Sequence, residues 1–416
     1  MHSAPRRRLP ARLALSAFSL ASLGALAAAC STTATFVDPV AMPDAAFAGV
    51  DTSVTPAQDS ATTTDAGKDP TMVEGWLKVV PGGNTICSDG SEYSFYVRKG
   101  TVNKVVVNFE GGGACWSHGI CSYPDLAYTS KIVTSALPWT GYSRASSIPG
   151  ILNQTRTDSL FKDWTIVHVP YCTGDIHWGT QDKTYTDAQG MNPLVIHHRG
   201  AVNATAALNY LYANETAPEK VFVTGESAGG YGAAMWAPYV RKQYGAGTHV
   251  YELSDSSAGV LADGFFSTLQ SAWNFQPTLP SFVPAFADPT KVKTIVDLFN
   301  GASAYGATTT PTLNFSMYNP AYDETQVKFY ALQQSGVTPQ SWSAKMREHV
   351  VTIKASAPAF RAYTAAGSVH TIMLSNTFYT DRIDGVSMHD WVAKMVNNDA
   401  YNNIDCNTTG AGCGTP

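Results

Sequence analysis

A serine between two glycines is the side chain of this sequence best suited to nucleophilic chemistry. Residues 225–229 read Gly-Glu-Ser-Ala-Gly, with Ser227 at the centre. The apolar run 221–223 precedes them and the glycine- and alanine-rich stretch 228–234 follows, which predicts a buried strand, a sharp turn and a helix. Such a turn exposes the serine hydroxyl at the start of the helix. We predict that Ser227 is a catalytic nucleophile; the alternative is a glycine-rich turn with a solvated serine.

A serine hydroxyl is a weak nucleophile at neutral pH, so it requires a general base and a carboxylate that orients this base. In the α/β-hydrolases, where serine lies on such a turn, the acid and then the histidine follow it along the chain. Downstream of Ser227 the histidines are His249, His349, His370 and His389. The position of His370 in the last predicted strand, 366–375, favours it as the base, and His389, at the start of a predicted helix, is the alternative.

Two aspartates are candidates for the acid. Asp323 follows a predicted strand at 313–318 and precedes a predicted helix at 324–334, whereas Asp255 follows the strand directly after the serine unit. In the hydrolase topology the acid usually follows a later strand than the one directly after the serine unit, which favours Asp323. Asp255 is then expected to hold a turn near the nucleophile.

Three glycines follow the buried strand predicted at 104–109. Glu110 is followed by glycine at 111, 112 and 113, where backbone N–H groups can approach a ligand closely. This resembles the oxyanion-hole loop of hydrolases with a His-Gly-Gly-Gly motif, with Glu110 in place of the histidine. A phosphate-binding loop is the alternative, but the lysine and hydroxyl residue of that motif are missing.

Strands that alternate with helices predict an α/β fold, with a mainly parallel sheet and helices on both faces. Ligand-binding loops of such sheets follow the carboxyl ends of the strands. The loop 172–179, which contains Trp178, follows a strand at 164–171 in this way. The aromatic and proline-bearing region 260–305 is expected to form a cap or a pocket wall.

Composition excludes some functions and favours an exported protein. The chain has 416 residues, of which 44% are hydrophobic and only 14% charged, against roughly 25% charged in typical soluble domains. A net charge of -5 and the lack of basic runs beyond the first dozen residues give no support for nucleic-acid binding.

The amino terminus has the pattern of an export signal. Four arginines among the first twelve residues precede an apolar stretch at 13–29, which ends in Ala-Ala-Ala before Cys30. We predict a signal peptide at 1–29, either cleaved near Ala29 or followed by a lipid anchor on Cys30. Residues 30–71 predict a flexible linker and 72–416 a catalytic domain, so the protein is expected outside the cytoplasm, secreted or anchored.

Without Cys30, six cysteines remain, an even number that suits disulfides in an oxidising compartment. Their spacing favours Cys115 with Cys121 and Cys406 with Cys413, which leaves Cys87 with Cys172. A metal site is the alternative, but no Cys-x-x-Cys and no clustered histidines accompany these cysteines. We expect no metal and no other cofactor.

Several separated motifs resemble those of the pectin acetylesterase family, which includes the Notum carboxylesterases. They are residues 109–115, Tyr171-Cys172, residues 225–230 and residues 322–326, in this order along the chain. The resemblance implies an α/β-hydrolase fold and the same three disulfides. It implies Ser227 as nucleophile, Asp323 as acid and His370 as base, with oxyanion donors on the backbone of Gly112, Gly113 and Ala228.

The function expected from these residues is a serine carboxylesterase that acts through an acyl-enzyme. By the resemblance, its substrate is an O-acetylated polysaccharide, and a fatty-acyl ester is the alternative if the region 260–305 walls a deep apolar pocket. A peptidase or lipase of the same fold is a weaker third hypothesis. A further alternative is a non-catalytic surface protein whose Trp116, Trp139 and Trp178 stack on sugars. As an esterase it would bind its substrate through Trp116 and Trp178, as a monomer.

Overall fold

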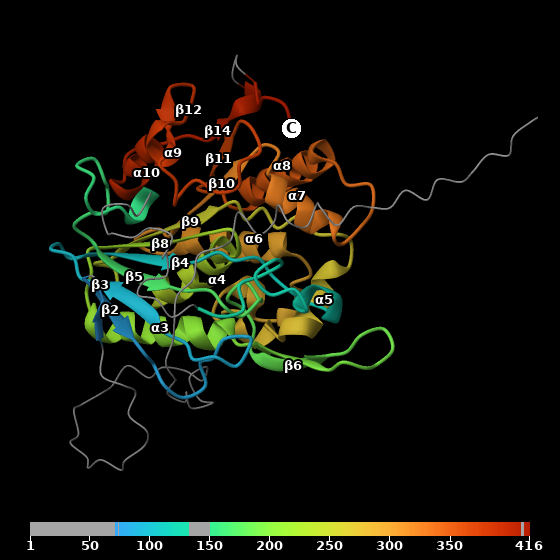
Figure 1. Cartoon of the computed structure of the whole chain (residues 1–416). Helices are drawn as coiled ribbons and strands as arrows, with labels where there is room; N and C mark the ends of the chain where they lie inside the picture. Colours follow the sequence, from blue (N-terminus) through green and yellow to red (C-terminus); the bar gives the residue numbers. More distant parts are fainter. Residues whose placement is uncertain (1–70, 74, 133–149, 409–411) are drawn as a thin grey trace, which may run out of the picture.

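The computed structural model describes residues 71–73, 75–132, 150–408 and 412–416. The predicted signal peptide, Cys30 and almost all of the predicted linker lie outside these residues, as does Trp139. In the described ranges, ten strands form one sheet in the order β1-β2-β3-β5-β4-β8-β9-β10-β11-β14 (Figure 1). These strands are β1 (Thr71–Val73), β2 (Trp76–Val79), β3 (Phe95–Arg98), β4 (Lys104–Phe109), β5 (Thr165–Val169), β8 (Lys220–Glu226), β9 (His249–Asp255), β10 (Asn314–Pro320), β11 (Arg361–Ala365) and β14 (Ile404–Asp405).

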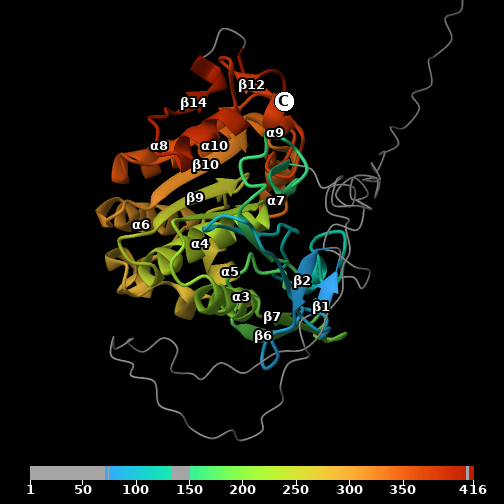
Figure 2. The same cartoon turned by 90° about the vertical axis from the view of Figure 1, so that its left-hand side faces the viewer.

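The sheet is antiparallel at one edge and parallel elsewhere. β1, β2 and β3 pair antiparallel, and β3 pairs antiparallel with β5. From β5 to β14 every neighbouring pair is parallel. Figure 2 shows β1 and β2 at one edge of the molecule and β14 at the opposite one. The predicted mainly parallel α/β sheet is therefore confirmed.

The central strands are apolar because both of their faces are buried. In β4, Val105 and Val107 point into one core and Val106 into the other. In β8, Val223 belongs to the first core and Phe222 to the second. This alternation explains why these segments are continuous hydrophobic runs instead of alternating with polar residues.

Helices cover both faces, as the sequence predicts. The first core packs against α3, α4 and α6, and the second against α9 and α10, which lie on the other side of the sheet in Figure 1. The helices are α2 (His118–Cys121), α3 (Gly200–Asn214), α4 (Ala228–Gln243), α5 (Phe265–Trp273), α6 (Ile295–Thr308), α7 (Glu324–Ala331), α8 (Pro339–Ser356), α9 (Thr377–Thr380) and α10 (Met388–Val396). Among the helices of the described residues, none has both the length and the hydrophobicity to cross a bilayer.

Short elements complete the chain. The hairpins are β6 (Gln181–Tyr185) with β7 (Leu194–His198), and β12 (Arg382–Ile383) with β13 (Val386–Ser387). Single 3-10 turns occur at η3 (Gly150–Leu152), η4 (Gln276–Thr278), η5 (Pro284–Phe286), η6 (Pro289–Lys291) and η7 (Cys406–Thr408).

Three disulfides join the pairs that the spacing favoured. Cys87 is bonded to Cys172, Cys115 to Cys121, and Cys406 to Cys413. The first joins the loop before β3 to the loop after β5, 85 residues apart. Such bonds fit a protein of an oxidising, extracytoplasmic compartment.

The strand predicted at 366–375 is wrong. β11 ends at Ala365, and His370 lies in the loop that follows. Gly367 and Thr371 have φ of +85° and +64°, which a strand does not allow. The histidine thus follows the carboxyl end of a strand, outside the sheet.

Candidate active site

The serine predicted as nucleophile lies on a strained turn between β8 and α4. Its φ of 55° and ψ of -123° are rare for a residue with a side chain, and such strain costs about 1–3 kcal/mol. The Ser227 N–H donates to the Asp255 carbonyl at 2.8 Å. A Cβ on Gly229 would lie 1.9 Å from the Phe109 carbonyl oxygen, so the close approach of α4 to β4 requires glycine there. The predicted strand, turn and helix are all present.

His370 and Asp323 are hydrogen-bonded to each other. The His370 Nδ1 lies 2.8 Å from Oδ2 and 2.9 Å from Oδ1 of Asp323. Asp323 is fully buried and caps α7, where Oδ1 accepts the N–H groups of Thr325 and Gln326. A carboxylate beside Nδ1 favours the tautomer with the proton on Nδ1, which leaves Nε2 free to accept a proton.

The environment of His370 suits a general base. Burial lowers its pKa, but the negative charge of Asp323 and the hydrogen bond to it outweigh burial, so the pKa lies above the usual 6.5. The Nε2 atom is buried and has no hydrogen-bond partner in the described structure. Ser227 and His370 line the same cavity. The structure thus brings together the three residues that the sequence predicted.

The rival residues lie elsewhere or have other partners. The ring of His389 is bound between Asp390 and the Asp158 carbonyl, and His389 does not line the cavity. Oδ2 of Asp255 accepts the N–H groups of Ile372 and Met373, at 2.8 Å each. Asp255 therefore holds the loop of His370 beside the turn of Ser227, the structural role expected of it.

The other two histidines downstream also differ from the base. His349 Nδ1 contacts the Ala258 carbonyl at 2.9 Å, and His349 does not line the cavity. His249 begins β9, at the end of the strand opposite Asp255.

The glycine loop that follows β4 reaches the same cavity. Gly113 lines it together with Ala114 and Ala228. Gly113 has a φ of +76°, and a Cβ there would lie 2.1 Å from the Ala127 carbonyl oxygen, so the position requires glycine. Ala228 is the first residue of α4, where helix N–H groups lack acceptors within the helix. Gly112 lies deeper, against Tyr171 and Thr129, and its carbonyl accepts the Thr129 N–H.

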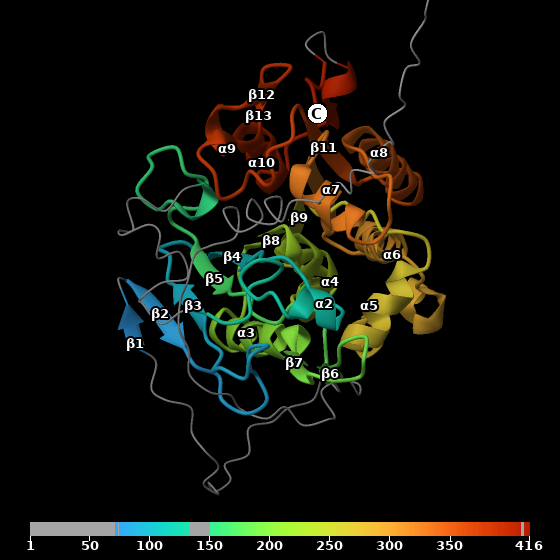
Figure 3. The same cartoon turned by 45° about the vertical axis from the view of Figure 1, so that its right-hand side comes forward.

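An apolar cavity of about 80 Å³ opens beside the serine. Trp116, Phe265 and Phe329 form one side, and the rings of Trp116 and Phe265 meet edge to face at 5.1 Å. Figure 3 shows α2, which follows Trp116, beside α5, which carries Phe265. The ring of Phe329, on α7, lies 6.3 Å from that of Trp116. The remaining apolar lining is Ile176, Val260, Leu261, Leu269, Trp273 and Ile295. Most of it belongs to the region 260–305 that the sequence predicted as a pocket wall.

One predicted substrate-binding residue is misplaced. Trp116 lies in the cavity wall as expected, but Trp178 has no exposed surface and does not line the cavity. Its indole N–H donates to the Tyr231 carbonyl at 2.9 Å, and its ring packs on Phe275. Trp178 is a core residue because its loop folds back under α4 instead of facing solvent.

Sequence reasoning missed two residues that support the site. Gln326 Nε2 donates to Asp323 Oδ2 at 2.9 Å, and Gln326 lines the cavity. Tyr231, one helical turn after the serine, lines it as well and accepts the Gly259 N–H. Gln326 belongs to the motif segment 322–326, so its place three residues after Asp323 could have predicted its role. No feature of the sequence predicted the role of Tyr231.

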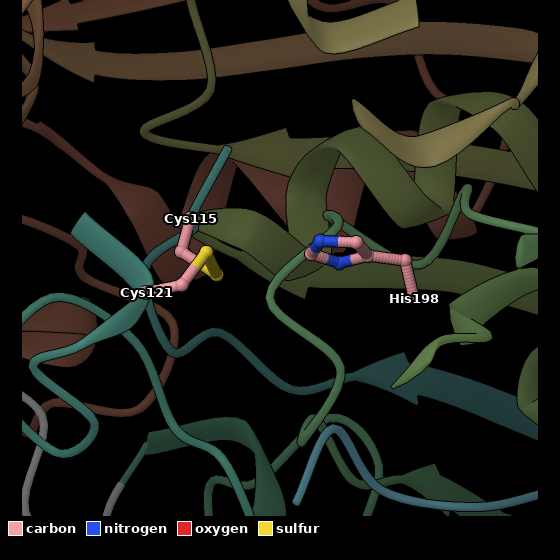
Figure 4. A group of neighbouring side chains, drawn as sticks. All are labelled: Cys115, Cys121 and His198. Carbon is pink, nitrogen blue, oxygen red and sulfur yellow. A yellow bond between two sulfur atoms is a disulfide. The ribbon is translucent and has the colours of Figure 1, made fainter. Parts of the chain in front are cut away.

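Two groups of metal-ligand types lie close together in the described residues. One is Cys115, Cys121 and His198, and the other Asp405, Cys406 and Cys413. Figure 4 shows the disulfide of the first group beside the imidazole. In both groups the cysteines are oxidised and offer no thiolate, and both nitrogens of His198 already contact Thr173 and Tyr185. Neither group fits a metal in this state.

The chain is similar to known esterases. A model of the pectinacetylesterase family matches residues 72–362. The palmitoleoyl-protein carboxylesterase NOTUM of Schmidtea mediterranea is 30% identical over 167 residues, which are 38% of this chain and 29% of that protein. Notum1 of Xenopus laevis is 28% identical over 163 residues, 38% of this chain and 31% of that protein. These matches span less than a third of the length of either relative.

Solved structures agree in fold. The Wnt deacylase Notum from Drosophila superposes with a TM-score of 0.58 at 18% identity, over 83% of this chain and 100% of that one. A second crystal form gives 0.56 at 18% identity, over 79% and 96%. At this identity the likeness shows the shared α/β-hydrolase-like fold. With the family match over most of the chain, the protein belongs to the pectinacetylesterase family, a family of carboxylic ester hydrolases.

Proposed function

We propose that the protein is a serine carboxylesterase with Ser227 as nucleophile, His370 as general base and Asp323 as the acid that orients it. The observation that carries the proposal is the hydrogen-bonded His370–Asp323 pair, whose free Nε2 shares one cavity with the strained serine turn. All three residues follow carboxyl ends of parallel strands, where binding sites of such sheets form.

The reaction proceeds through an acyl-enzyme. Ser227 Oγ forms a bond to the ester carbonyl carbon while its proton moves to His370 Nε2. The tetrahedral intermediate then breaks its bond to the alcohol oxygen, which takes the proton from His370. Water, deprotonated by the same nitrogen, releases the acid and restores the serine.

The negative oxygen of the intermediate requires N–H donors. We assign this role to Gly112, Gly113 and Ala228, where each donor lowers the barrier by about 3 kcal/mol. Gly113 and Ala228 line the cavity together with Ser227, which supports the assignment for these two residues, and Gly112 is included because it belongs to the same glycine loop.

The cavity favours an apolar acyl group larger than acetyl. Aromatic and aliphatic side chains form most of its wall, a lining that gives a two-carbon group little to bind beyond one methyl. Its 80 Å³ corresponds to about six waters, at about 10–15 Å³ each. We therefore expect an acyl chain of about four to eight carbons to fit this space better than acetyl or palmitoyl.

Acetyl esters of polysaccharides stay the second candidate, because the family description names a pectin acetylesterase. An acetyl group enters the same cavity and leaves most of it filled with water. The two candidates differ in how the rate depends on chain length.

A series of p-nitrophenyl esters separates them. We expect kcat/KM to rise from acetate to butyrate and octanoate and to fall at palmitate, and acetylated pectin to be a poor substrate. Leu269→Trp, which fills the cavity, should then lower the octanoate rate and spare acetate, while Leu332→Trp on the exposed surface changes neither. A maximum at acetate with rapid release of acetate from pectin would favour the deacetylase.

Ser227→Ala decides whether this is an esterase of the proposed kind. We expect it to abolish activity and labelling by a fluorophosphonate. A folded wild-type protein that neither hydrolyses esters nor reacts with the probe would favour the non-catalytic binding protein.

We also propose that residues 1–29 direct export and that Cys30 carries a lipid. The three disulfides support export, because they form in oxidising compartments. Cys30→Ser should move the protein from the membrane fraction to the soluble one without a change in kcat. If the wild type and Cys30→Ser were distributed alike between the two fractions, the result would favour cleavage near Ala29 and simple secretion.

A further inference from the structure

Two glutamates lie beneath the active site, and the mechanism above uses neither. Glu110 directly precedes the glycine loop 111–113, and Glu226 directly precedes Ser227. Phe109 of β4 is paired with Gly225 of the parallel strand β8. The parallel register therefore places Glu110, the first residue after β4, next to Glu226, the last residue of β8.

The side chain of Glu226 joins the two loops. Its Oε1 accepts the N–H of Gly111, the first residue of the glycine loop, at 2.9 Å. Gly111 also packs directly on the nucleophile turn, because a Cβ there would lie 2.5 Å from the Glu226 carbonyl oxygen and 3.0 Å from the Ser227 Cβ. This hydrogen bond thus ties the start of the glycine loop to the residue before the nucleophile.

Glu110 fixes the same loop from the other side. Its Oε2 accepts the Tyr171 N–H at 3.1 Å, and its own N–H donates to the Val169 carbonyl at 3.0 Å. Its carbonyl lies 2.8 Å from the His177 Nε2, a nitrogen that must donate in this contact. The peptide before Gly111 therefore has little freedom to move.

The two carboxyl groups favour the neutral form. Glu226 is only 7% exposed, and its Oε2 has no hydrogen-bond partner in the described structure. Burial raises the pKa of Glu226 well above its usual range, and the nearby Glu110 raises it further. Burial also raises the pKa of Glu110 to about 8, against a smaller opposing effect of the Tyr171 N–H. A neutral carboxyl group is closely mimicked by the amide of glutamine.

We propose that Glu226 is a positioning residue for catalysis: its side chain holds Gly111, and through it Gly113, where the oxyanion of the intermediate forms. The proposal rests on the proposed function. It does not make Glu226 a catalytic residue, since its carboxyl group contacts the loop and not the substrate. Its effect should therefore appear in the chemical step and not in substrate binding.

Glu226→Met and Glu226→Gln test this, both assayed on p-nitrophenyl butyrate. Methionine fills the space without an acceptor for the Gly111 N–H, whereas glutamine keeps the acceptor oxygen. We expect Glu226→Met to lower kcat by about tenfold or more with KM within about twofold, and glutamine to restore kcat to within about threefold of the wild type. Rates are taken per serine titrated to completion with a fluorophosphonate, so that misfolded protein does not count.

Glu252→Met is the matched control, because Glu252 is another fully buried glutamate, on β9, which does not contact the glycine loop. We expect its kcat per titrated serine to equal the wild-type value. If Glu226→Met does not fold, Glu226→Ala replaces it, with the same expected changes in kcat and KM.

The proposal would be overturned if Glu226→Met, Glu226→Ala and Glu226→Gln all had the same kcat. It would also be overturned if Glu252→Met lost as much kcat as Glu226→Met. A rise in KM at constant kcat would overturn it too. Wild-type protein whose activity does not depend on Ser227 would instead refute the proposed function, so the two failures are distinguishable.

Discussion

The replacement Asp323→Asn tests how His370 is oriented. Oδ1 of Asp323 accepts two backbone N–H groups, from Thr325 and Gln326, and Oδ2 accepts the side-chain amide of Gln326. An asparagine must keep its oxygen on the side of the two backbone donors. Its amide nitrogen then takes the place of Oδ2 and faces the Nδ1 of His370.

An amide donor at this place reverses the tautomer of His370. Nδ1 becomes the acceptor, so the proton moves to Nε2, the atom that must receive the proton of Ser227. The imidazolium also loses its stabilising negative charge. From the cost of the wrong tautomer in serine hydrolases, we expect kcat to fall about 10³–10⁴-fold, which corresponds to about 4–5.5 kcal/mol of barrier.

The assay is hydrolysis of p-nitrophenyl butyrate across pH, with kcat and KM separated and folding checked by thermal unfolding. Asp255→Asn is the matched control, since Asp255 is also buried and also accepts two backbone N–H groups beside the serine. Its other oxygen faces the hydroxyl of Ser256, which can turn to accept an amide hydrogen. We expect its kcat to change by less than about tenfold.

Two results would refute the reasoning. One is a loss below about tenfold in Asp323→Asn. The other is an equal or larger loss in a folded Asp255→Asn protein, which would make Asp255 the acid. In either case the geometry of the pair would not describe the working enzyme.

Three further predictions concern pH and the glycine loop. Because protonated His370 cannot act as a base, kcat/KM should fall with decreasing pH through an apparent pKa above 6.5. A kcat/KM that stays constant down to about pH 5 would exclude His370 as the general base. Gly113→Ala should lower kcat at least about 100-fold, since its Cβ collides with the Ala127 carbonyl and displaces the loop; unchanged kinetics would place the oxyanion elsewhere. Burial raises the pKa of Glu252 from 4.5 to about 8, so the folded state holds this proton more tightly and loses stability as pH rises from 4.5 to 8. Glu252→Gln should remove a loss on the order of a few kcal/mol, seen as a flatter dependence of Tm on pH across this range, and an unchanged dependence would contradict the assignment.

The sequence determined those features that depend on neighbouring residues. The glycines around Ser227 allow one sharp turn between an apolar strand and a small-residue helix, and this turn is present. The short spacings of the cysteines at 115 and 121, and at 406 and 413, allow ready closure, which is why their pairing could be predicted. The runs of valine in the central strands specify strands buried on both faces, and hence a parallel sheet.

Tertiary structure decided what depends on the meeting of distant segments. His370 was predicted inside a strand, but β11 ends earlier, and a loop held by Asp255 carries the imidazole to Asp323, 47 residues away. Trp178 was predicted to bind substrate, but packing against Tyr231 and Phe275 buries it away from the cavity. The bond from Gly111 to Glu226 spans 115 residues, and nothing in either segment specifies it. Local patterns set the backbone of each segment, whereas the distances between segments follow from how side chains of distant segments pack together in the two cores.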